Sequence, residues 1–231
     1  MQLRINKILK SQQGFSLIEI LVALLLVATI MALSISNPFG TTDDLESEVK
    51  NIERAITYMS DESAIRNTIT RLHIYLSKDP QEYAIEYGPS SQFVLPAKSE
   101  DSINVMTKEE EEAKAKETKE INSKFARISD FQESNATLKE SVKVFAVGDA
   151  KSKMIQENGE VSVYSFPSGE KDEVFIALYQ DESIATITTS AFTSKIVHNY
   201  YHLDRKDENL MKEERLKKAK ELFETWLKEK K

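Results

Sequence analysis

One long apolar stretch lies near the start of the chain. The segment 15–36 holds a single charged side chain, that of Glu19. A helix of this length rises roughly 33 Å, which is enough to cross a hydrocarbon core of about 30 Å. The pattern therefore predicts a transmembrane helix over residues 15–36.

After this stretch the apolar residues take the spacing of an amphipathic helix. Asn37-Pro38-Phe39-Gly40 interrupts the first helix, because proline removes a backbone donor and glycine is a weak helix former. We expect a second helix over 43–70 that packs one apolar stripe on a sheet. Arg66 and Arg71 near its end suit the negative pole of the helix dipole, and a solvated face accounts for them equally well. The stripe consists of Leu45, Val49, Ile52, Ile56 and Met59.

Between residues 71 and 203 apolar and polar residues alternate, as they do in half-buried β-strands. Asn158-Gly159 and Ser168-Gly169 mark turns within this region. We expect an antiparallel meander from the first three strands, and seven or eight strands in one or two sheets altogether. The short runs are 72–76, 83–87, 92–95, 142–147, 161–166, 174–179 and 183–188.

A charged insertion interrupts this β pattern at 97–140. Acids and bases alternate over 108–119, and Thr107 with Glu110 forms a capping box, so we expect a short solvated helix. The insertion is either an interaction loop or a mobile segment, and the second is favoured. Three apolar residues are expected to tie it to the core, namely Phe125, Ile128 and Phe131.

The tail, 204–231, predicts an amphipathic helix. Its apolar face either packs on the chain's own domain or docks to another subunit, and the sequence leaves both open. The docking interpretation assigns the contact to Phe223, Trp226 and Leu227, because a buried tryptophan often dominates an interface. A membrane-surface helix is disfavoured, because glutamates dilute the basic face. The face consists of Leu216, Ala219, Phe223, Trp226 and Leu227.

Composition narrows the classes of partner. The 231 residues leave room for one soluble domain after about the first 40. A formal net charge of −7 argues against generic electrostatic binding to nucleic acid or to anionic lipid. Because the chain has no cysteine, disulfides, thiol nucleophiles and cysteine-ligated metals are excluded.

The sequence contains no pattern typical of a catalytic or metal-binding site. His73 is expected in a strand, and His198 and His202 in a strand or loop, all as surface histidines without a third metal ligand. The acidic run 109–112 lacks the spacing of a calcium loop. No phosphate-binding loop or nucleophile elbow occurs. We expect a protein that is not an enzyme and that has no cofactor and no metal.

Charges on either side of the apolar stretch predict its orientation. Bases precede it and acids follow it, so the N-terminus is expected in the cytoplasm and the rest of the chain outside it. Gly14 stands before the apolar run, whereas an ordinary secretory signal is cut after its apolar core. A permanent, uncut signal anchor is the alternative. The flanking residues are Arg4, Lys7, Lys10, then Asp43, Asp44, Glu46 and Glu48.

Glu19 is the most informative residue of this region. A charge at bilayer depth costs about 2.5 to 3.5 kcal/mol, so such a residue is a candidate for function, with a partner to be identified. The sequence from Gly14 through Phe15 to Glu19, followed by apolar residues, resembles the class III signal of type IV pilins and type II secretion pseudopilins. The resemblance implies that a prepilin peptidase cuts after Gly14 and that Phe15 is methylated. It also implies that Glu19 pairs with the N-terminal amine of a neighbouring subunit.

The order of the elements resembles the H-type minor pseudopilin, GspH, and the minor pilins FimT and FimU. A strand, the turn at Phe166 to Gly169, two apolar strands and a Thr-Ser-Lys stretch carry this resemblance. It implies an α+β, pilin-like fold. The long N-terminal helix, transmembrane and then amphipathic, packs on an antiparallel sheet or two-sheet domain, and an extra helix follows at the C-terminus.

Together these resemblances imply a single-pass protein of the bacterial inner membrane. The leader would be 1–14, the N-terminus cytoplasmic and the domain 71–203 periplasmic. The implied partners are prepilin peptidase, other major and minor pseudopilins, the inner-membrane assembly platform and, through the N-terminal helix, the membrane itself. No nucleic acid is expected.

Three hypotheses remain open. The first is a structural subunit of the periplasmic pseudopilus of type II secretion. The second is a minor type IV pilin for pilus assembly or DNA uptake, against which acidity and the lack of cysteine speak. The third is a membrane-anchored periplasmic enzyme or binding module in which Glu19 is coincidental.

Overall fold

The computed structural model describes residues 17–35, 42–90, 108–129, 135–204 and 208–230, with the side chains of the first helix given as far as Val27. Residues 1–40 and 41–231 form two separate compact units. Several predictions lie outside the described residues: the leader 1–14 with Gly14, Phe15, the strand 92–95, Thr107 of the capping box, and Phe131.

Helix α1 runs from Leu17 to Ile35, inside the segment 15–36 for which a helix is predicted. Glu19 lies in its first turn and is the one charged residue of the helix. A negative side chain at this position is favourable, because the first turn carries the positive end of the helix dipole.

Helix α2, Thr42–Arg66, carries the predicted stripe, all of which is buried. The prediction that the helix extends to residue 70 is wrong. It ends because Asn67 adopts a left-handed backbone with φ of 50°, a conformation that stops helices. Thr68 already belongs to the next strand, β1 (Thr68–Tyr75), so the β region begins earlier than residue 71.

Sheet A is a five-stranded antiparallel sheet in which β1 occupies a central position. Its neighbours are β2 (Glu82–Ser90) and β7 (Glu160–Ser165), and two short strands flank β2. The first two strands of the predicted meander pair as expected, the third, 92–95, lies outside the described residues, and β1 also pairs with a strand about 90 residues further along the chain, which the sequence did not predict. Alternation shows which residues form strands, but it carries no information about which strands pair. The short strands are β3 (Ala126–Arg127) and β4 (Asn135–Thr137).

Sheet B is also antiparallel and has the strand order β10-β9-β8-β5-β6. The described residues contain ten strands in all, four of which match no predicted run: β3, β4 and β6 are too short to leave a pattern in the sequence, and β10 was missed. His198 and His202 lie in β10. The bounds are β5 Lys143–Asp149, β6 Met154–Gln156, β8 Val174–Gln180, β9 Ser183–Thr189 and β10 Ile196–His202.

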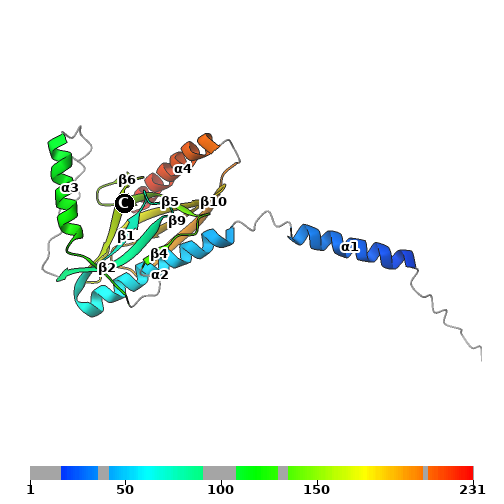
Figure 1. The fold of residues 1–231 in the computed structure, drawn as a ribbon, viewed down its shortest axis with the longest axis horizontal. Coiled ribbons are helices and arrows are strands. Elements are labelled where there is room, and N and C mark those ends of the chain that lie inside the picture. Colours follow the sequence, from blue (N-terminus) through cyan, green and yellow to red (C-terminus); the bar gives the residue numbers. More distant parts are fainter. Residues whose placement is uncertain (1–16, 36–41, 91–107, 130–134, 205–207, 231) are drawn as a thin grey trace, which may run out of the picture. The chain divides into compact units, whose positions relative to one another are not determined.

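The main core joins α2 to both sheets, as Figure 1 shows for the arrangement of these elements. The stripe of α2 lies against Leu72, Ile74 and Ile85 of sheet A and against Ile176 and Leu178 of sheet B. The predicted packing of the stripe on a sheet is thereby confirmed. The α+β class is confirmed as well, and the arrangement is compatible with a pilin-like fold.

The insertion contains helix α3, Lys108–Asn122, whose described side chains are mostly exposed. Phe125 and Ile128 are buried, as predicted, and fasten its C-terminal end to sheet A. The ring of Phe125 lies directly on Gly88 of β2, where a Cβ would overlap it. Glycine at this position is what allows the ring so close to the strand.

Candidate functional site

The predicted processing and assembly residues belong to the N-terminal segment, of which the structure describes Glu19. Every large apolar side chain from Leu17 to Val27 leaves half or more of its surface exposed. These side chains follow one another along the helix, so α1 is apolar all round in this part. A continuous apolar surface of this kind marks contact with lipid or with other chains. In the described ranges, no helix is both long and apolar enough to cross a membrane.

A buried ion pair lies on the face of sheet A opposite α2. Arg71 of β1 stands beside Glu86 of β2, and its Nη2 lies 2.6 Å from Glu86 Oε2. Arg71 is only 2% exposed. The placement of Arg71 near a helix end is therefore wrong. Strand alternation could have placed Arg71 in a strand, on the face opposite the core-facing Leu72, but it gives no sign that this face is buried.

Arg71 also connects the sheet to the insertion. Its Nη1 donates to Asn122 Oδ1 at the end of α3, at 2.7 Å. The Phe125 ring covers its guanidinium, with 4.1 Å between Cζ and the ring centroid. One arginine thus contacts both a strand partner and two residues of the insertion. A planar guanidinium suits this role, because it combines fixed donors with a face that stacks on aromatic rings.

His73, two residues further along β1, is 3% exposed. The prediction that it is a surface histidine is therefore wrong. Its Nε2 donates to Glu160 at 3.1 Å, and its Nδ1 accepts from Ser162 Oγ at 2.7 Å, since a carboxylate can only accept. Burial, followed by the charge of Arg71, lowers the pKa of His73. The ring is therefore neutral at neutral pH.

Ser162, His73 and Glu160 form a hydrogen-bonded row of the residue types found in hydrolase triads. A triad needs a base that a bound substrate can reach, whereas the imidazole here is almost completely buried. The row joins β1 to β7. Among the described residues, no group of three or more histidine or acidic side chains could hold a metal ion. His198 and His202 are exposed.

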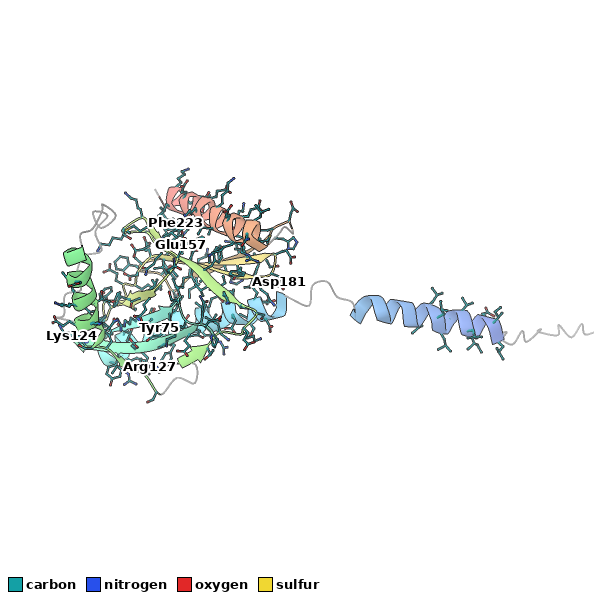
Figure 2. All side chains as sticks on the ribbon, turned by 45° about the horizontal axis from the view of Figure 1, so that its top comes forward. Tyr75, Lys124, Arg127, Glu157, Asp181 and Phe223 are labelled. Atoms are coloured by element: carbon teal, nitrogen blue, oxygen red, sulfur yellow. The ribbon has the colours of Figure 1, made fainter. Side chains whose placement is uncertain are left out.

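The C-terminal helix α4, Glu208–Glu229, packs on the face of sheet B that is turned away from α2. Phe223 is 4% exposed, and its ring centroid lies 5.7 Å from that of Phe175. A Cβ on Gly148 would overlap the Phe223 ring. Figure 2 shows Phe223 on the side of α4 that faces the sheet.

Polar contacts hold both ends of α4 on sheet B. Near its start, the Arg215 guanidinium lies 4.0 Å from the Tyr179 ring centroid and donates to the Asp181 carbonyl at 2.6 Å. Near its end, Lys230 Nζ lies 2.7 Å from Glu173. The apolar face of α4 is therefore occupied by the chain's own sheet, one of the two alternatives that the sequence left open. Trp226 and Leu227 are only partly buried, and the docking role of Phe223, Trp226 and Leu227 stays a prediction.

Comparison with protein families gives one finding. Residues 9–35 match the family model of the prokaryotic N-terminal methylation motif. The match includes Gly14, Phe15 and Glu19, and it indicates a type IV pilin-like protein. It implies processing by prepilin peptidase and assembly with other pilin-like proteins. No match was found among curated proteins or solved structures.

Proposed function

We propose that this chain is a structural, non-enzymatic minor pseudopilin of the H type, a subunit of the periplasmic pseudopilus of a type II secretion system. The methylation motif over 9–35 is the observation that carries the proposal. The motif supports a filament subunit of the pilin type, and the order of elements in the domain favours the H type within that group.

Cleavage after Gly14 explains the chemistry of Glu19. The cut turns Phe15 into the first residue, and an α-amino group with an ordinary pKa of about 7.7 to 8.0 is largely protonated at neutral pH. In the filament, the Glu19 carboxylate of one subunit pairs with the Phe15 amine of the next. Pairing offsets much of the cost of holding either charge in apolar surroundings.

The exposed apolar surface of α1 supports the same proposal. A helix that is apolar all round is covered either by lipid or by other helices. Before assembly, α1 anchors the subunit in the inner membrane with its N-terminus in the cytoplasm. After assembly, the corresponding helices of neighbouring pseudopilins take the place of lipid, and the inner-membrane assembly platform drives this exchange.

Cleavage can be tested on the processed protein. A Gly14→Leu variant is expected to stay at precursor length, because it puts a bulky side chain directly before the proposed cut. Intact-mass spectrometry of the wild type should give a chain that starts at a methylated Phe15. Gln13→Leu is the matched control and should be processed normally. A mature Phe15 terminus in the Gly14→Leu variant would contradict the proposed processing.

A gene deletion separates the pseudopilus from the pilus. For a pseudopilin, the deletion strain should keep its folded exoproteins in the periplasm, while surface pili remain. The alternative function, a minor type IV pilin, predicts normal secretion together with loss of pili or of DNA uptake. The acidic, cysteine-free composition favours the first outcome.

A further inference from the structure

Sheet B ends in a long strand, β10, whose outer edge carries no further strand from the described residues. Strand β10 pairs only with β9 among the described strands. All seven residues of β10 are in continuous register with β9, without a bulge. An open edge of this kind presents backbone donors and acceptors to any other strand.

The other sheet edges in the described part of the chain are short or covered. At the far side of sheet B, β6 has three residues, and β3 and β4 at one side of sheet A have two and three. The C-terminal end of the β7 edge is covered by the segment that follows it. Tyr164 N donates to Asp172 Oδ2 at 3.0 Å, and Asp172 N donates to the Tyr164 carbonyl at 2.8 Å. Among the described strands, β10 is therefore the longest at the edge of a sheet.

The sequence of β10 lacks the features that protect natural edge strands. Residues 196–202, IVHNYYH, contain no lysine, no acid and no proline, and such residues are what usually prevent edge pairing. The strand is instead rich in β-branched and aromatic side chains, which favour cross-strand pairs. The nearest charges stand just outside the strand, with Lys195 before it and Asp204 after it.

The side chains of β10 are accessible on both of its faces. On the face towards α2, His198 Nδ1 lies 2.6 Å from Glu53, and Tyr200 is 44% exposed. On the other face, Val197 is 37% exposed, and Lys218 of α4 lies 5.9 Å from the Tyr201 ring centroid. A second strand beside β10 would therefore gain side-chain contacts on both faces of the sheet.

We propose that β10 pairs with β10 of a second copy of this chain, antiparallel and centred on Asn199. In this register Val197 stands opposite Tyr201 of the second copy, and His198 opposite Tyr200 of the second copy. Each pair lies on one face of the joined sheet, and neither brings like charges together.

The charges at the ends of the strand favour this direction of pairing. In this antiparallel register Lys195 of each copy stands opposite Leu203 of the other, one position from Asp204, and the two Lys195 side chains lie at opposite ends of the pair. Parallel pairing would bring the two Lys195 side chains together instead. An antiparallel second copy of β10 thus avoids like charges along the edge and brings a base and an acid near each other at each end.

A contact of this kind is isologous, since the same residues meet from both sides. It closes on itself, whereas a filament needs a contact that repeats in one direction. The pair therefore belongs to subunits outside the filament. It goes beyond the proposed function and does not depend on Gly14 or Glu19.

Single cysteines in the full-length chain test this contact directly, because the natural sequence has no cysteine. In an Asn199→Cys variant the two introduced residues face each other, with Cα atoms about 4.5 to 5.5 Å apart, a distance that a disulfide spans. Mild oxidation of membranes that contain this variant should give a covalent dimer on a non-reducing gel.

Cysteines at other positions of β10 test the proposed register. In a Val197→Cys variant the two cysteines lie four strand positions apart, about 13 Å, and should not cross-link. A mixture of Val197→Cys chains with Tyr201→Cys chains should cross-link. Adding Asn199→Lys to both chains of this mixture places two like charges opposite each other and should reduce the dimer several-fold.

Three results would overturn the proposal. The first is the absence of a dimer both from Asn199→Cys and from the mixture. The second is an equally strong dimer from Val197→Cys alone, which indicates parallel pairing or random collision. The third is a cross-linked product of another mass, which shows that a different protein occupies the edge.

Discussion

At the residue scale, the role proposed for Glu19 rests on the energetic cost of a carboxylate in apolar surroundings. It is the one charged residue of α1, in a helix whose described large apolar side chains are all exposed. The methylation motif supplies the candidate partner, a newly made amine at Phe15. The motif itself could be read from the sequence, because its residues are contiguous along the chain, and the pairing of Glu19 stays a prediction.

We predict that Glu19→Leu is processed normally but is lost from the filament. The substitution leaves Gly14 and Phe15 unchanged, whereas the carboxylate that pairs with the neighbouring amine is gone. Quantification of the chain in sheared or cross-linked filaments, relative to total mature chain, measures the effect. Val22→Leu on the same helix should assemble like the wild type. Equal incorporation of Glu19→Leu would rule out the pairing role.

The polar cluster around the buried Arg71 and His73 of sheet A could not be identified from the sequence. Arg71, His73, Glu86 and Glu160 come from three strands, and their contacts depend on β1 lying between β2 and β7. Alternation places Arg71 and His73 on one face of a strand, yet that face is normally solvated in an antiparallel sheet. Only the insertion, which covers the face with Asn122 and Phe125, makes it interior.

His73 gives a prediction about pH. Burial and Arg71 lower the folded-state pKa of His73, while Glu86 and Glu160 act in the opposite direction. Above pH of about 6.5 the imidazole is neutral in both states, and its neutral form contributes fully to stability. As the pH falls below that value, the unfolded chain takes up a proton that folded His73 does not, so the free energy of unfolding decreases until the folded-state pKa is passed.

We therefore predict that His73→Gln reduces the loss of stability between pH about 7.5 and 5. Urea unfolding midpoints at both values, for the variant and the wild type, provide the measurement. His202→Gln, at an exposed site, should keep the wild-type dependence. If His73→Gln loses as much stability on acidification as the wild type, the neutral buried histidine is not a source of the pH dependence.

At the element scale, the periodicities identified α2 and six of the seven longer strands among the described residues. The seventh, β10, was missed. The end of α2 was missed, because the apolar stripe does not reveal that Asn67 leaves the helix. The pairing of β1 with β7 was also missed, since strands distant in sequence meet only through the common core. For α4 the sequence showed that one face of the helix is apolar. Only the structure shows that this face packs on sheet B.

The packing of α4 predicts a large effect for Phe223→Ala. Phe223 fills the space between Phe175, Trp226 and Gly148. Removing its ring should lower the free energy of unfolding by about 3 to 5 kcal/mol. Fluorescence of Trp226, the single tryptophan of the chain, can follow urea unfolding.

Glu224→Ala, next to Phe223 but exposed, is the matched control and should change stability by no more than about 0.5 kcal/mol. Truncation after Leu203 removes the same contacts and should lower the melting temperature markedly. Wild-type stability in both Phe223→Ala and the truncated chain would show that α4 is a docking element and not part of the core.

At the scale of the whole molecule, the chain separates into an apolar helix and a domain with its own core. Both buried apolar clusters consist of residues from Leu45 onward, and residues 41–231 form one compact unit. Nothing in these clusters comes from α1.

We predict that residues 41–231, produced without the first 40, fold on their own. Circular dichroism should show the mixed helix and strand content, and thermal unfolding should be cooperative. Removing a further stretch, through Met59, is the control, because it deletes the stripe of α2 from the core and should abolish folding. An unfolded or aggregated 41–231 fragment would mean that the domain depends on the N-terminal segment.

The sequence alone determined what depends on neighbouring residues. It showed the processing motif around Gly14 and Phe15, the charge of Glu19 in an apolar helix, the stripe of α2 and the strand periods, because period and motif are local properties. The tertiary structure decided the features that depend on contacts between residues far apart in the sequence. These are the order of the strands, the burial of Arg71 and His73, the packing of α4 on sheet B, and the position of β10 at the edge of its sheet. These follow from how two sheets share one core around α2, and no local pattern encodes that arrangement.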